Sequence, residues 1–207
     1  MTPQGQKLLD AYEQRKKDLE KMPEHLNMFI RNNLLSLLHH SLVDDWNSID
    51  VLYHKPRVER LWRAIEIEGC KYRLGLHPIH PVDHPAECLD HYHPWGSTVK
   101  ILSVGYNMGF SFGDPWEPAP PKAITSFYGP GSTYSMLHPF GRHYVQPTGI
   151  MSTSIILMAE PWEKGLFPPE DETHDMSVNQ PIDRDRKKLI LTRFREDILH
   201  LIAHDLL

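Results

Sequence analysis

The stretch that decides the fold runs from residue 89 to residue 102 and reads LDHYHPWGSTVKIL. Successive side chains of a β-strand point to opposite faces, so His91 and His93 should lie on one face, about 7 Å apart along the strand. Two imidazoles that project into a barrel can share one metal ion, because neutral imidazole is a common metal ligand. The candidate for a third ligand is His143, which follows a turn and begins a β-prone run. His138 competes for this role but lies within the turn itself, before Pro139.

The residues around this stretch have the pattern of an antiparallel barrel or sandwich. Between residues 70 and 162, short β-prone runs alternate with clusters of Gly, Pro and Asp, such as Gly113-Asp114-Pro115. Several short strands at close intervals are typical of such folds. The predicted strands are 71–76, 98–106, 123–127, 131–137, 143–145 and 152–158.

The flanking segments have helical patterns. Apolar residues recur at helical spacing from residue 3 to residue 19 and again from Pro23 to Leu42, and a shorter helix is predicted over residues 57–67. Residues 163–181 are polar and proline-bearing and predict a loop, after which a final helix begins near Ile182-Asp183. We therefore expect an N-terminal helical extension (1–68), a β-barrel (69–162), and a loop and C-terminal helix that pack on the barrel (163–207).

Composition sets limits on location and partners. The 207 residues are 40% hydrophobic and 24% charged, which is ordinary for a soluble globular chain. The charged N-terminal segment lacks the apolar core of a signal peptide, so we expect a cytoplasmic protein without a membrane partner. A net charge of −5 argues against a nucleic-acid partner. The long helical segments suit a homo-oligomer.

The first histidine segment resembles the first motif of the cupin superfamily. That motif is H-x-H, three or four residues, Glu, six residues and Gly. Here His91-Tyr92-His93 is followed by four residues, Thr98, six more residues and Gly105. A Thr therefore stands where the family usually has a carboxylate ligand.

The second histidine segment resembles the second cupin motif, which is Gly, a short strand, P-x-G, two residues and His. The chain has Gly131, then Pro139-Phe140-Gly141-Arg142-His143, with one residue fewer before the histidine. The two motifs span residues 89–145, about a quarter of the chain. The resemblance implies a cupin-type antiparallel barrel, a jelly roll or double-stranded β-helix, with His91, His93 and His143 as metal ligands.

A site of three neutral ligands is similar to that of the thiol dioxygenases related to cysteine dioxygenase. Such a site keeps the full positive charge of the metal and leaves positions open for an anionic, bidentate substrate and O₂. The resemblance implies Fe(II), and three histidines also suit Ni, Mn or Zn.

One strand departs from the thiol dioxygenase pattern. That group has Ser-x-His-x-Tyr on the strand after the third ligand, whereas this chain has Ser154, Ile156 and Met158. Activity on cysteine itself is therefore not implied. Cys88 is expected to be a plain thiol, because the family's crosslinking cysteine position is occupied by Thr98. The segment also looks like uncharacterised bacterial and phage cupins, a likeness that assigns no reaction.

Candidate substrate-binding residues lie near the motifs. Arg73 and Arg142 are candidates to pair with a substrate carboxylate, because guanidinium binds carboxylates through two hydrogen bonds. Tyr106 is a candidate to line the pocket, as are Trp95 and Tyr134. The remaining histidines of this region are predicted to form a polar loop near the barrel mouth: His77, His80 and His84.

The leading hypothesis is a mononuclear non-haem iron oxygenase of cupin type that acts on a small polar, anionic molecule. Two alternatives remain open. One is a cupin that binds a ligand or assembles a larger structure without catalysis, and the other is a metal-dependent isomerase or lyase, which would turn over without O₂.

Overall fold

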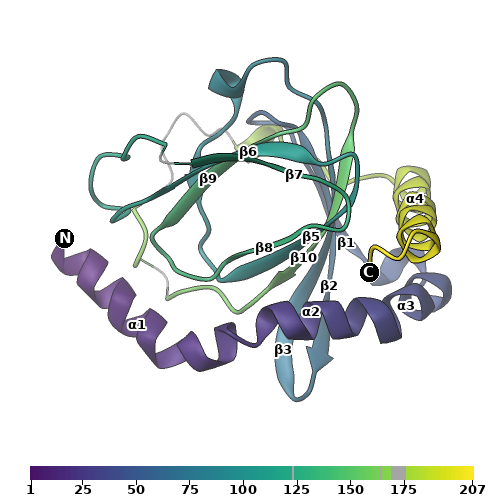
Figure 1. Ribbon diagram of the computed structural model, residues 1–207, viewed down its shortest axis with the longest axis horizontal. Helices are drawn as coiled ribbons and strands as arrows, with labels where there is room; N and C mark the ends of the chain where they lie inside the picture. The colour runs from purple at the N-terminus through teal and green to yellow at the C-terminus, as the bar shows by residue number, and fades with distance from the viewer. Residues whose placement is uncertain (123, 164, 169–175) are drawn as a thin grey trace.

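The computed structural model describes residues 1–122, 124–163, 165–168 and 176–207. Within these residues the chain forms helices towards both ends and two antiparallel β-sheets between them (Figure 1). The helices are α1 (Pro3–Leu19), α2 (Met22–Phe29), the π-helical turn η1 (Ile30–Leu34), α3 (Leu35–His40) and α4 (Arg184–Ala203), with 3-10 turns η2 (Val43–Asp45), η3 (Pro85–Glu87) and η4 (Met176–Val178). The strands are β1 (Asn47–Val51), β2 (Val58–Ile67), β3 (Cys70–Ile79), β4 (His91–Tyr92), β5 (Ser97–Ser103), β6 (Tyr106–Phe112), β7 (Ile124–Tyr128), β8 (Thr133–Met136), β9 (Gly141–Gln146) and β10 (Ser152–Met158).

The strand order identifies a jelly roll. One sheet has the order β1-β2-β3-β10-β5-β8 and the other has the order β4-β9-β6-β7. Strands β3, β10, β5 and β8 therefore face β4, β9, β6 and β7 across the barrel (Figure 1). Two facing four-stranded sheets connected in this way make the double-sheet jelly roll found in cupins. The predicted fold class, a mainly β jelly-roll barrel flanked by N-terminal helices and a C-terminal helix, is confirmed.

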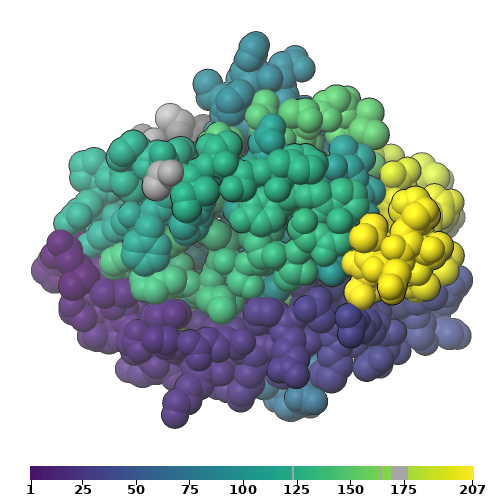
Figure 2. All heavy atoms as spheres, in the orientation of Figure 1, coloured from purple at the N-terminus to yellow at the C-terminus, as the bar shows by residue number. Residues whose placement is uncertain are grey.

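Side-chain alternation divides the core into an inner and an outer layer. Along β5, Val99 and Ile101 belong to the apolar cluster inside the barrel, whereas Leu102 belongs to the cluster beneath the helices. The outer cluster joins the six-stranded sheet to α1, α2, α3 and α4. Figure 2 shows these helices, purple and yellow, packed directly against the barrel. The helices thus cover the outer face of one sheet and leave the barrel interior to a separate set of side chains.

The prediction of a helix over residues 57–67 is wrong, because these residues form strand β2. Apolar residues at 58, 61, 62 and 65 match helical spacing, yet the same set serves a strand that is covered on both faces. Val58 faces the barrel interior and Leu61 faces the helices. Together with β1, this strand extends the first sheet, so the N-terminal helical segment ends at His40.

Most of the other predicted elements agree with the structure. The six predicted strands overlap β3, β5, β7, β8, β9 and β10, and the final helix begins after its N-cap Asp183. The prediction of a single strand over residues 98–106 is wrong at its C-terminal end, because β5 ends at Ser103 and the chain turns at Val104-Gly105 into β6. Residue 123 of the predicted strand 123–127, and residues 164 and 169–175 of the predicted loop, lie outside the described residues. Among the helices that are described, none is long and apolar enough to cross a membrane.

Candidate metal centre

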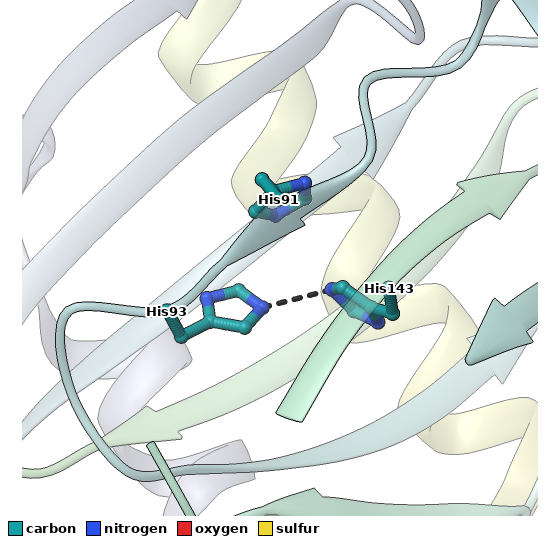
Figure 3. Close-up of side chains that lie close together, drawn as sticks. All are labelled: His91, His93 and His143. Atoms are coloured by element: carbon teal, nitrogen blue, oxygen red, sulfur yellow. Dashed lines mark hydrogen bonds between the residues drawn. The ribbon is translucent and has the colours of Figure 1, made fainter. Parts of the chain in front are cut away.

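Three histidines converge inside the barrel (Figure 3). His91 on β4 is the cross-strand partner of His143 on β9, and His93 follows β4 by one residue. The ligand nitrogens of the three rings all lie within 4.8 Å of one another. The Nε2 atoms of His93 and His143 are 2.8 Å apart. The structure therefore brings together the three residues that the sequence predicts as ligands.

Neighbouring acceptors fix which ring nitrogen can bind a metal. The Nδ1 of His91 lies 3.2 Å from the carbonyl oxygen of Leu89, which can only accept, so this Nδ1 carries the proton and donates it. The Nδ1 of His143 lies 3.1 Å from the sulfur of Met108, and donation to that sulfur leaves the Nε2 lone pair facing His93. An outer hydrogen bond that sets the tautomer in this way is usual for metal-binding histidines.

Burial keeps the three rings neutral. It lowers the pKa of His91 to about 4. The pKa values of His93 and His143 are also well below the usual 6.5, because of burial first and then of repulsion within the cluster. Neutral imidazole is the form that binds a metal, so the donor set fits a divalent cation at neutral pH.

The prediction that Thr98 occupies the place of a carboxylate ligand is wrong. Thr98 lies on the same face of β5 as Leu102, which contacts the helices, and its hydroxyl is 2.9 Å from the hydroxyl of Ser135. Ser97 and Val99 are the residues of this part of β5 that face the interior. The candidate metal cluster found among the described residues consists of the three histidines, without a carboxylate.

Strand β10 forms an apolar wall of the interior. Ile156 and Met158 belong to the inner cluster, in the alternate positions of this strand. Ser154 has the same orientation by alternation and shares a hydrogen bond with Tyr106. Ile156 and Met158 therefore present an apolar surface to the site region.

The three predicted substrate-side residues occupy different environments. Arg73 is exposed near the start of β3, with its guanidinium 6.0 Å from the centre of the Trp95 ring. Arg142 lies on the outer face of β9 and pairs with Asp90 at 2.8 Å. Tyr106 is buried inside the barrel, and its hydroxyl lies 2.8 Å from that of Tyr134.

Sequence reasoning missed Arg60 and misplaced His77. The register of β2 against β3 places Arg60 opposite His77, and the register of β3 against β10 places His77 opposite Ser154. These three residues form a polar row on the inner face. Burial and then the positive charge of Arg60 lower the pKa of His77, and the same charge acts on His91 and His93. The row therefore lies close to the histidine cluster.

Both differences follow from the predicted elements. The predicted helix over residues 57–67 conceals the inward orientation that Arg60 has in β2. The predicted loop around His77 is wrong, because His77 belongs to β3. His80, in contrast, follows the strand and lies 3.0 Å from the carboxylate of Glu59. Residues 58–62, Val-Glu-Arg-Leu-Trp, do not alternate between charged and apolar side chains, so this part of β2 gives no strand signal of its own in the sequence.

No protein-family model and no curated protein matches the chain. Several solved structures resemble part of it. Hydroxypropylphosphonic acid epoxidase from S. wedmorenis has 10% identity and a TM-score of 0.40, with 57% of this chain and 57% of that chain covered. A structure of Fe(II)-HppE with an alternative substrate has 10% identity and a TM-score of 0.41, with 57% and 58% covered. A cupin domain from Bordetella pertussis has 12% identity and a TM-score of 0.33, with 49% and 93% covered. The chain thus spans little more than half the length of the epoxidase structures.

The strand order and the histidine cluster together define the class of molecule. It is a jelly-roll barrel with a three-histidine candidate metal site in its interior.

Proposed function

We propose that this protein is a mononuclear, metal-dependent oxygenase of cupin type that binds Fe(II) and acts on a small anionic molecule. The observation that carries the proposal is the convergence of three neutral histidines, with the donor nitrogens within 4.8 Å of one another. Bound Fe(II) would supply a Lewis-acidic centre with open positions for substrate and O₂. His91, His93 and His143 would hold it.

Arg60 supports an anionic substrate. It faces the interior, and its charge is felt by two of the three candidate ligands. A guanidinium and a divalent metal on neutral ligands give a strongly positive interior, which favours a carboxylate or a similar anion. Arg60 is better placed for this role than Arg142, whose side chain lies outside the barrel, or Arg73, which is exposed near the start of β3.

The rest of the polar row supports a substrate with a second polar group. His77 is held neutral by burial, so it can donate one hydrogen bond and accept another. Ser154 and Tyr106 extend the polar surface towards the opposite sheet. Ile156 and Met158 provide an apolar wall beside it that limits water. The substrate we expect is therefore small, anionic at one end and polar at the other.

Oxygen consumption tests the proposal. Protein loaded anaerobically with Fe(II) is mixed with fractionated small polar metabolites in an oxygen-electrode cell, with His91→Ala as the control. Substrate-dependent O₂ uptake that His91→Ala abolishes is the expected result. Turnover that proceeds equally without O₂ would instead identify an isomerase or lyase, and saturable binding without turnover would identify a ligand-binding cupin. Either outcome would refute the oxygenase.

A further inference from the structure

Two of the three candidate ligands belong to a segment with little regular structure to hold it. Strand β4 has two residues, His91 and Tyr92, and lies at the edge of its sheet. Its ladder to β9 consists of two residue pairs, His91 with His143 and Tyr92 with Arg142. His93 lies just beyond it. A metal site needs its ligands placed to within a fraction of an ångström, so some other contact has to fix this segment.

An ion-pair network on the outer face of the same two strands provides that contact. The Nε of Arg142 donates to a carboxylate oxygen of Asp90 at 2.8 Å, and one of its terminal nitrogens donates to the backbone carbonyl of Asp90 at 3.1 Å. The guanidinium also lies 5.1 Å from the centre of the Tyr92 ring. Arg142 therefore contacts the side chain of Asp90, the backbone of Asp90 and the ring of Tyr92.

A second cation completes the network. The amino group of Lys122 pairs with the same carboxylate oxygen of Asp90 and donates to the hydroxyl of Ser111 on β6 at 3.3 Å. Asp90 is thus connected both to β9 and to the neighbouring strand β6. The side chains of Asp90 and Arg142 are 26% and 20% exposed, so water weakens this attraction only in part.

The Asp90–Arg142 ion pair lies next to two of the candidate metal ligands in the sequence. Asp90 directly precedes His91, and Arg142 directly precedes His143. Because alternate side chains point to opposite faces, the ion pair closes on the outside of the sheet at the point where the two imidazoles meet on the inside. We propose that the Asp90–Arg142 pair positions β4 on β9 and so sets the spacing of the metal ligands. Both residues act through the histidines and are positioning residues.

This inference rests on the proposed metal function, and a Co(II) titration tests the two separately. Visible absorption of Co(II) reports affinity and ligand geometry without turnover. The variants are Arg142→Met, Asp90→Asn and Arg142→Lys. The control is Arg57→Met, which breaks an ion pair of 2.6–2.8 Å with Asp50 at one end of the β1–β2 hairpin. The melting temperature of the metal-free protein is measured for each.

Groups that hydrogen-bond directly to a metal ligand are worth about 10- to 100-fold in metal affinity, so the Asp90–Arg142 pair, which acts on the ligands through the backbone, is expected to contribute about 10-fold. Arg142→Met and Asp90→Asn should each weaken Co(II) binding by about that factor and alter its spectrum, and Arg142→Lys should recover part of the loss. Arg57→Met should change the affinity by less than about twofold. Wild-type affinity in both Asp90→Asn and Arg142→Met, or an equal loss in Arg57→Met, overturns the positioning role alone. A wild-type protein that binds no Co(II) overturns both proposals.

Discussion

Removing the guanidinium of Arg186 is expected to loosen the C-terminal helix from the barrel. Arg186, in the first turn of α4, donates hydrogen bonds of 2.6 and 2.5 Å to the two carboxylate oxygens of Glu59 on β2. The Glu59 side chain is 1% exposed, and His80 also contacts it at 3.0 Å. The variant Arg186→Met would leave this carboxylate buried with a weaker set of partners.

The size of the loss follows from the burial. Breaking a buried ion pair by removing one partner costs about 3–5 kcal/mol, because the other charge stays buried. We expect the lower end, about 3 kcal/mol, since Arg186 is 38% exposed and His80 remains beside Glu59. For a chain of this size the melting temperature should then fall by about 6–12 °C.

The pH dependence of the stability loss in Arg186→Met tests whether the Glu59 carboxylate causes it. Burial alone would raise the pKa of Glu59, but the hydrogen bonds from Arg186 and His80 outweigh it and lower the pKa to about 2, from an ordinary 4.5. A carboxyl group with a lowered pKa stabilises the fold above its unfolded-state pKa and loses that contribution as the pH falls. The difference between wild type and Arg186→Met should therefore be largest near pH 7 and shrink to about half by pH 3.

Urea denaturation at several pH values measures these differences. The matched control is Arg184→Met. Arg184 lies two residues before Arg186 on the same helix and forms an exposed ion pair with Asp44. That control should lose less than about 1 kcal/mol. The double variant Glu59→Gln with Arg186→Met should recover much of the loss, because the uncompensated charge is gone. The reasoning fails if Arg186→Met costs no more than Arg184→Met, or if its deficit is the same at pH 3 and pH 7.

Three further predictions concern the barrel and its candidate metal site. Arg60→Met should weaken the binding of small carboxylates to the Co(II)-loaded protein by about 10-fold or more, measured by calorimetry, and unchanged affinity would remove Arg60 from the substrate site. Gly75→Ala should destabilise the fold by about 1–3 kcal/mol in urea denaturation, because its methyl group would lie 2.6 Å from a methyl group of Ile156. Thr98→Val should leave Co(II) affinity within about twofold of wild type, since this side chain faces away from the metal site; a large loss would restore it as a ligand.

The grouping of the three histidines could be predicted from the sequence because it depends on local rules. Alternation in a strand places His91 and His93 together, and the matching position of His143 after a turn supplies the third ring. The C-terminal helix could be predicted because Asp183 is an N-cap and an apolar stripe follows.

Other features depend on contacts that sequence patterns do not specify. The apolar spacing of residues 58–65 fits either a helix or a strand covered on both sides, and only the pairing of β2 with β1 and β3 decides between them. That misreading concealed Arg60. Motif spacing also aligned Thr98 with a ligand position, but the orientation of β5 turns Ser97 and Val99 inward instead.

Metal content is the most direct test of the central claim. Protein purified without chelators is analysed by plasma mass spectrometry for wild type, His143→Ala and His138→Ala. His138 lies in the turn before β9 and contacts Tyr12 and Phe112 outside the cluster, so its loss is the matched control. About one equivalent of a divalent metal is expected in wild type and His138→Ala, and none in His143→Ala. Metal at trace level in the wild type, or full retention in His143→Ala, would contradict the three-histidine centre.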